Sequence, residues 1–344
     1  MTSNRRLTIL AAVLVVLAAV AISIFLWPQE KAVGLQPASI NYPMMYAMEE
    51  GFIEKVEGDL EVQVFGSANN ALDALLSNDI VFDAAIPLQN VVETERNNPN
   101  SLGIAAFVIS DEEHPIDYLI APSGSSIKAP SDLAGKTVVV FRGAYSETLT
   151  RITLEKLGIT NVSFIKRSPG DMAQALRTGE ADAGVFYNPV ATQAVEEGWG
   201  RVIESAFWEK NLTPSLIVGV YTYRVPSVEE NPKMMRQLIS NVQNATIEAR
   251  KNPTEAKKAT RAYLGGFDDN VLSQIPDARV VLPSEIDPAI YRQTMQLYEE
   301  EGLVQEIVDL EELVHRPWEG EVIQRPSSSD SVQSSAAGNS ESSR

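Results

Sequence analysis

The sequence predicts an α/β protein built from two lobes, on the basis of its length, its alternating pattern and an internal repeat. The chain has 344 residues, which suits two globular units of roughly 100–200 residues each, with some residues left over. Short apolar runs alternate with stretches of helical periodicity, a pattern typical of sheets with parallel strands. A helix, a tight turn, an aspartate and a strand follow one another at 76–87, and again about a hundred residues later at 176–185. Two interpretations of this repeat stay open: any αβ unit has this order, or each lobe contains one copy.

The first elements of the chain are a charged start and a long uncharged segment. Arg5 and Arg6 precede the stretch Leu7–Trp27, which would span about 30 Å as a helix, the thickness of a bilayer core. We predict a transmembrane anchor at 7–27, with residues 1–6 in the cytoplasm and the rest of the chain outside it. A signal peptide cleaved after 19–21 is the alternative, but cleavage there would leave the apolar segment 22–27 exposed.

The folded body is expected between Val33 and Trp318, after a polar connector at 28–32. Strands are predicted at the apolar runs 62–65, 82–86, 118–121, 137–141, 162–165, 183–186 and 216–221. Helices are predicted between these strands, and residues 228–262 and 286–313 are rich in helical pattern. The last segment, 325–344, is dominated by serine and has little to bury, so we expect it to be disordered.

Composition excludes several classes of function. The chain has no cysteine, which rules out disulfides, thiolate metal sites, cysteine nucleophiles and a lipid-modified cysteine. The net charge of −18 repels phosphate backbones, so we expect no nucleic acid partner. The only histidines, His114 and His315, lie far apart without the spacing of metal ligands. We therefore expect no catalytic residues, no metal and no cofactor.

Several segments of the chain resemble type II periplasmic binding proteins, the solute-binding proteins of ABC importers. The resemblance is carried by these segments in order: Tyr42–Glu54, Ser131–Val140, Gly143–Glu147, Asp171–Leu176, Gly179–Ala183, Val228–Lys233 and Asn252–Ala256. Together they are most similar to the binders of taurine, aliphatic sulfonates, nitrate and thiamine precursors. The resemblance implies a type II two-lobe fold with a ligand cleft at the hinge. Lobe one would comprise 33–120 plus 216–318, and lobe two 121–215.

The resemblance also implies where a ligand would bind in lobe one. Ligands of open α/β sheets lie beyond the carboxyl ends of the strands, where helix N-termini offer free N–H groups. In lobe one the expected ligand-binding residues are Asn41, Tyr42, Gly66, Ser67 and Pro87. Local alternatives stay open, since Asn41 and Ser67 are also good helix caps, Tyr42 can pack in the core and Pro87 can form a turn.

In lobe two the same reasoning points to two loops. The expected ligand-binding residues there are Arg142, Gly143, Tyr145, Ser146, Tyr187 and Asn188. Gly143 would let the backbone approach a ligand, and the Arg142 guanidinium suits a sulfonate, carboxylate or phosphate. For Arg142 a solvated surface position is the alternative. Asp83 and Asp182, which belong to the two copies of the repeat, are expected to be structural.

The expected function is that of a membrane-anchored, extracytoplasmic solute-binding protein working with ABC permease subunits. Arg142 favours an anionic ligand, whereas Tyr42, Tyr145 and Tyr187 favour a planar heteroaromatic one, so both classes stay open. Two other functions also stay open: an enzyme of the thiamine-pyrimidine or menaquinone type on the same fold, and an anchored ligand sensor.

Overall fold

The computed structural model describes residues 31–58 and 60–314. The predicted anchor at 7–27, the predicted tail at 325–344 and His315 lie outside this range. Within it, none of the helices combines the length and the apolar character that crossing a membrane requires.

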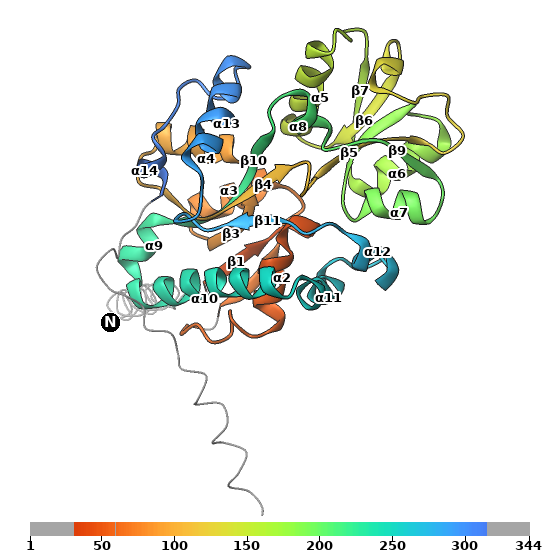
Figure 1. Ribbon diagram of the computed structural model, residues 1–344. Helices are drawn as coiled ribbons and strands as arrows, with labels where there is room; N and C mark the ends of the chain where they lie inside the picture. Colours follow the sequence, from red (N-terminus) through yellow and green to blue (C-terminus); the bar gives the residue numbers. More distant parts are fainter. Residues whose placement is uncertain (1–30, 59, 315–344) are drawn as a thin grey trace, which may run out of the picture.

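Two separate sheets organise the described chain, and they form the two halves seen in Figure 1. The first sheet has six strands in the order β11-β4-β10-β3-β1-β2. Its strands are β1 (Ala32–Leu35), β2 (Glu61–Val64), β3 (Ile80–Ile86), β4 (Leu102–Asp111), β10 (Ser215–Arg224) and β11 (Arg279–Val281). Strand β1 runs parallel to β2 and β3, whereas β10 is antiparallel to β3 and β4.

The second sheet has five strands in the order β7-β6-β8-β5-β9. They are β5 (Asp117–Pro122), β6 (Thr137–Phe141), β7 (Ser163–Arg167), β8 (Ala183–Tyr187) and β9 (Gly200–Ser205). Strand β6 is parallel to β7 and β8, and β5 is antiparallel to β8 and β9. The two-sheet α/β architecture expected from the sequence is therefore present.

The chain crosses between the sheets twice, at 112–116 and at 206–214, and we call these two segments the hinge. The sequence-based lobe boundary between residues 120 and 121 is wrong, because it falls inside β5. Tyr118 and Leu119 already pair with β8 and β9 of the second sheet. A hydrophobic run marks a strand in the sequence but does not tell which sheet the strand joins.

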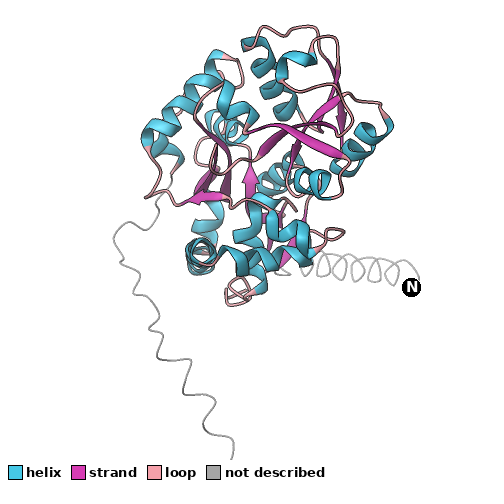
Figure 2. Ribbon diagram, turned by 45° about the vertical axis from the view of Figure 1, so that its right-hand side comes forward, coloured by secondary structure: helices cyan, strands magenta, loops and turns pink. Residues whose placement is uncertain are grey.

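Helices cover the sheets of both lobes (Figure 2). In the first lobe they are η1 (Ser39–Asn41), α2 (Tyr42–Glu49), α3 (Ala68–Ser77), α4 (Leu88–Asn97), α9 (Val225–Glu230), α10 (Pro232–Lys251), α11 (Pro253–Tyr263), α12 (Asp269–Gln274), α13 (Pro288–Glu300) and α14 (Leu310–Leu313). In the second lobe and hinge they are η2 (Pro130–Leu133), α5 (Ala144–Lys156), α6 (Pro169–Thr178), α7 (Val190–Glu196) and α8 (Phe207–Asn211).

The internal repeat is divided between the two sheets. Helix α3 ends at Asn78 and leads into β3, and α6 ends at Gly179 and leads into β8, with both end residues in the left-handed conformation that stops a helix. Each sheet thus contains one copy, as the interpretation of two similar lobes requires. The aspartates differ, because Asp182 accepts a hydrogen bond from the Thr137 amide at 2.8 Å, whereas Asp83 is fully buried.

The hydrophobic core continues through the hinge. Val138 and Val140 of β6 belong to a core that also includes the first lobe and Phe207 and Trp208 of α8. Val139, on the other face of the same strand, belongs to a separate cluster under α6 and α7. Because one hydrophobic core joins the two sheets, Phe207 and Trp208 of the hinge belong to the same core as residues of both lobes.

Four strands were not among those predicted from the sequence: β1, β4, β9 and β11. Every residue of β4 is buried, as in β3, which was predicted from its apolar run. Strand β11 has only three residues, and its pairing with β4 depends on chain segments far apart in sequence.

Candidate functional site

The two lobes contact each other near the carboxyl ends of their parallel strands. The Ser39 hydroxyl, in η1 after β1, donates a hydrogen bond to the Asn188 carbonyl after β8 at 2.9 Å. The Tyr145 hydroxyl of α5 lies 2.9 Å from the Tyr298 hydroxyl of α13. Two of the sequence-predicted residues, Tyr145 and Asn188, therefore lie where the lobes meet.

Asn41 is the predicted lobe-one residue whose side chain has an unsatisfied atom. Its Nδ2 donates to the Gln36 carbonyl at 2.8 Å and to the Ala84 carbonyl at 3.4 Å. Its Oδ1 is buried and has no hydrogen-bond partner among the described residues. The capping alternative is wrong, since the Asn41 side chain does not bond the first turn of α2. A buried oxygen without a partner is rare, so Asn41 is a candidate for ligand contact.

The loop after β3 has two features that sequence reasoning missed. Ala85 has a φ of 67°, a left-handed conformation that a residue with a Cβ seldom adopts. Gln89, in the first turn of α4, is buried, and its Oε1 has no partner in the described part of the chain. Pro87 lies between them as the residue before α4, in the extended conformation of a turn. No local sequence signal marks the strain at Ala85.

Tyr42 and Ser67, two other residues predicted to bind a ligand in lobe one, have the local structural roles that were their alternatives, core packing and helix capping. The Tyr42 ring packs against Ala249 and Ala256, and burial is the main cause that raises the pKa of its hydroxyl. Ser67 caps α3, with its Oγ accepting from the Asn70 amide at 3.3 Å. Gly66 beside it is exposed.

In lobe two, Arg142 and Gly143 connect β6 to α5. The Arg142 side chain is exposed and makes no ion pair within residues that the structure describes, while its amide donates to the Arg167 carbonyl at 2.9 Å. Gly143 has a φ of 128°, which strains any residue with a Cβ. The glycine is thus required by its backbone angle, since the space around it is open.

Five aromatic side chains form a continuous series of ring contacts from lobe two to lobe one, which we call the aromatic row. The successive centroid distances are 5.9 Å, 5.9 Å, 5.8 Å and 6.4 Å along Phe141, Tyr187, Trp208, Tyr145 and Tyr298. Burial raises the pKa of the Tyr145 and Tyr187 hydroxyls, so both stay protonated and remain hydrogen-bond donors. The Ser146 Oγ beside Tyr187 is buried and has no partner with good geometry among the described residues.

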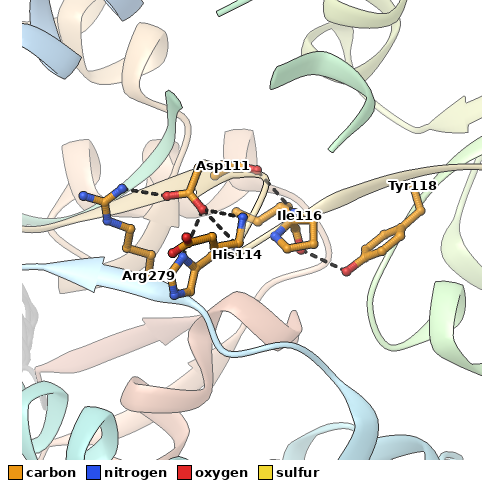
Figure 3. A network of polar contacts seen from close by, with 8 residues as sticks. Asp111, His114, Ile116, Tyr118 and Arg279 are labelled. Atoms are coloured by element: carbon orange, nitrogen blue, oxygen red, sulfur yellow. Dashed lines mark hydrogen bonds and ion pairs between the residues drawn. The ribbon is translucent and has the colours of Figure 1, made fainter. Parts of the chain in front are cut away.

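The first crossover is tied together by Asp111, as Figure 3 shows. Its Oδ1 accepts from the His114 amide at 2.8 Å and lies 3.0 Å from His114 Nδ1, while its Oδ2 accepts from Arg279 at 2.6 Å. Burial by itself would raise the pKa of Asp111, but the hydrogen bonds from Arg279 and His114 outweigh it and hold the pKa below its ordinary value. At the end of this crossover, the Tyr118 hydroxyl donates a hydrogen bond to the Pro115 carbonyl at 3.1 Å.

The second crossover contains a different kind of carboxyl site. Asp117, the first residue of β5, and Glu209 of α8 are both buried and face each other. Asp117 Oδ2 accepts from the Trp208 amide at 3.1 Å, but Asp117 Oδ1 and both Glu209 oxygens have no geometric partner within the described chain. Sequence reasoning missed this pair, although an acidic residue directly after Phe207 and Trp208 was a possible signal.

A metal centre is not formed by these groups. In the residues covered by the structure, no three or more His, Asp or Glu side chains are grouped so as to hold a metal ion. What the site offers instead is neutral hydrogen-bonding groups and aromatic faces in both lobes.

A family model described as NMT1/THI5 like matches residues 41–256. The chain belongs to this NMT1/THI5-like family. The matched span runs from Asn41 through the whole second lobe to Ala256 in α11, so it includes every sequence-predicted site residue.

Relatives of this NMT1/THI5-like chain carry binding-protein names. It is 24% identical over 249 residues to a binding protein of Brucella abortus (strain 2308), covering 70% of this chain and 73% of the relative. It is 25% identical over 209 residues to a protein of Escherichia coli (strain K12) named as aliphatic sulfonates-binding, covering 58% of this chain and 63% of the relative. The crystal structure of the periplasmic aliphatic sulphonate binding protein SsuA from Escherichia coli shares the fold, with a TM-score of 0.66 and 20% identity over 87% of this chain and 96% of that one.

Proposed function

We propose that this chain is an extracytoplasmic solute-binding protein that holds a small ligand between its two lobes and delivers it to an ABC permease. The observation that carries the proposal is a set of buried polar atoms with no hydrogen bond of good geometry among the described residues, each following a strand end in one of the two lobes: Asn41 Oδ1, Gln89 Oε1 and Ser146 Oγ. Buried polar atoms in proteins are nearly always paired, so a ligand that supplies the missing partners accounts for all three. The names and fold of the relatives support the same class of function.

The ligand we propose is small and either anionic or heteroaromatic, of the sulfonate, taurine or nitrate kind or of the thiamine-pyrimidine kind. An anion is supported by the unpaired Arg142 guanidinium and by the N-terminus of α5 next to it. A planar ring is supported by the aromatic row, whose faces offer stacking surfaces. The sulfonate-binding name of the Escherichia coli relative favours the anion.

We further propose that residues 7–27 anchor the protein in the membrane, with the folded body on the extracytoplasmic side. The support is the uncharged segment behind Arg5 and Arg6. An anchor of this kind keeps a binding protein close to its permease.

A ligand screen by thermal unfolding of the full-length chain tests the proposal. The panel contains taurine, alkanesulfonates, nitrate, bicarbonate, thiamine pyrimidines and aromatic carboxylates. A ligand at 100 times its dissociation constant should stabilise the fold by about 2.7 kcal/mol. We expect the stabilisation to be reduced in Ser146→Ala and retained in Ser163→Ala, a matched change at the amino end of β7, the opposite edge of the same sheet.

The screen also distinguishes the alternatives. A folded, cooperative protein that none of these compounds stabilises would contradict an importer function for these ligand classes. Chemical turnover of a bound compound would indicate an enzyme on this fold, and binding without a permease partner would indicate a sensor.

A further inference from the structure

The hinge buries two carboxyl groups against each other without a cation. Asp117 is 0% exposed and Glu209 is 2% exposed. The hydrogen-bonding groups beside this pair include the Trp208 amide, which donates to Asp117 at 3.1 Å, the Phe207 amide, and the Ser110 hydroxyl at the end of β4. Three of the four carboxyl oxygens have no geometric partner among the described residues.

The titratable groups that surround the pair come from five elements. They are Asp111 of β4, Tyr118 of β5, Tyr145 of α5, Tyr187 of β8 and Tyr298 of α13. The cationic groups of this region, Arg279 and His114, are engaged by Asp111. All neighbours of the pair are thus acidic or phenolic, and none of them compensates a negative charge.

Two carboxylates in this environment cannot both be ionised at low cost. Removing a charge from water without a partner costs several kcal/mol, and a second like charge alongside it adds to that cost. Burial first, and then the mutual repulsion of the two groups, raises the pKa of Asp117, and burial raises that of Glu209. The pair therefore holds at least one proton that both carboxyl groups can share.

We propose that a proton shared by Asp117 and Glu209, at the junction of the two crossovers, holds the lobes in the arrangement seen here, and that losing it opens them. The geometry supports this because the pair joins the two hinge segments directly: Asp117 begins the strand after the first crossover, and Glu209 lies within the second. Ser110 of β4 and Tyr298 of α13 lie beside Glu209, so a lobe opening that withdraws these first-lobe groups would admit water to the pair. The opened arrangement therefore tolerates two negative charges that the present one does not.

The direction of the pH dependence follows from proton binding. The arrangement seen here binds one proton more than an opened, hydrated hinge, so raising the pH favours opening and lowering it favours closure. The Tyr145–Tyr298 and Ser39–Asn188 hydrogen bonds, which join the lobes beside the hinge, would break in the opened form.

Spin-label distance measurement on the full-length chain tests the proposal. Because the chain has no cysteine, two introduced cysteines can be labelled without background. Val195→Cys on α7 (48% exposed) and Ser273→Cys on the exposed side of α12 report on the lobes, since these helices contact each other across the lobe boundary. The distance distribution is recorded while the pH is raised from about 5 to about 9.

We expect the unsubstituted hinge to shift to longer distances as the pH rises. Glu209→Gln and Asp117→Asn should each abolish the shift, because either leaves at most one charge at this pair of positions. Two variants should leave it unchanged. Asp83→Asn removes a buried acid of lobe one, whose pKa burial raises to about 8, away from the hinge. His114→Asn removes the histidine beside Asp111 in the first crossover.

The outcomes decide the proposal without knowledge of the ligand. A distance that stays constant across the pH range would overturn it. So would a shift that persists unchanged in Glu209→Gln, or one that disappears in Asp83→Asn or His114→Asn. If one of the two hinge variants fails to fold, the other decides. Because no ligand is added, failure here leaves the proposed solute binding unaffected.

Discussion

The two crossovers of the hinge place acidic side chains close together in space but in opposite charge states. At the first, Asp111 accepts hydrogen bonds from Arg279 and from His114, and its pKa lies below the ordinary value. At the second, Asp117 and Glu209 have no cation to face, and the pKa of each is raised. Burial raises the pKa of the carboxyl groups at both crossovers, so the difference in charge state comes from the side chains that face them. The first crossover is held by charge, and the second by a shared proton and aromatic packing.

The largest expected effect comes from removing the packing of the second crossover. Trp208 is 1% exposed, contacts Tyr145 and Tyr187, and donates from Nε1 to Thr150 at 3.3 Å. Trp208→Ala should lower the free energy of unfolding by about 3–5 kcal/mol, measured by chemical denaturation. The matched control is Trp199→Ala, a half-buried tryptophan on the other face of the second sheet, which should cost clearly less. Equal losses of unfolding free energy in the two variants would mean that Trp208 in the hinge contributes no more to stability than Trp199.

Removing the charge at the first crossover should have the next largest effect. Asp111→Asn weakens the hydrogen bonds with Arg279 and His114 and should cost about 1–3 kcal/mol at neutral pH. Since the pKa of Asp111 is lowered on folding, its contribution is present above the ordinary value of 3.8 and is lost as the pH falls below it. The difference in unfolding free energy between the two proteins should therefore shrink at about pH 3. A constant difference would contradict the ionic description.

The first site can also be made to resemble the second. Arg279→Met removes the cation from Asp111 but keeps a side chain of similar length on β11. We expect the pKa of Asp111, followed by carboxyl NMR titration, to move upward, because burial is then opposed only by His114 and the backbone amides. Lys257→Met, which removes a distant ion pair with Asp277, is the control and should leave the titration of Asp111 unchanged. An unchanged Asp111 in Arg279→Met would mean that the backbone amides and His114 alone set its charge.

The smallest effects are expected at single contacts between the lobes. Ser39→Ala removes the buried hydrogen bond to Asn188 and should cost about 1 kcal/mol. Asn270→Ala removes an exposed hydrogen bond from α12 to Glu196 of α7 and should stay within about 0.5 kcal/mol. Both are measured by denaturant unfolding, and a reversed order would contradict the view that buried lobe contacts dominate exposed ones.

Local patterns were sufficient for most of the fold. The strands predicted at 82–86, 137–141 and 183–186 coincide with parts of β3, β6 and β8, because short apolar runs between helical stretches have few other structures open to them. Gly143 was expected to let the backbone approach a ligand, whereas the structure shows a different reason for the glycine, its φ of 128°. Strand β4 was missed although it is an apolar run buried on both faces, as β3 is.

The positions of the predicted site residues in the fold could be anticipated only in part. Their role in ligand binding stays a prediction, but Tyr145, Ser146 and Asn188 lie at the lobe contact or beside it, because they follow the ends of strands β6 and β8. Tyr42 follows a strand in the same way, yet its ring turns into a small cluster with Ala249 and Ala256, residues more than 200 positions away. A strand end brings a residue to the right edge of a sheet but does not choose the direction of its side chain.

By itself, the sequence determined that the chain folds as two α/β lobes, resembles solute-binding proteins and lacks cysteine chemistry, because these properties follow from local periodicity, collinear motifs and composition. Only the tertiary structure decided the lobe boundary, the aromatic row and the charge states of the hinge acids. Asp111 and Asp117 are six positions apart and carry the same functional group. Arg279 approaches one and Glu209 the other from distant parts of the chain, and the energy of a buried charge depends on which partner arrives.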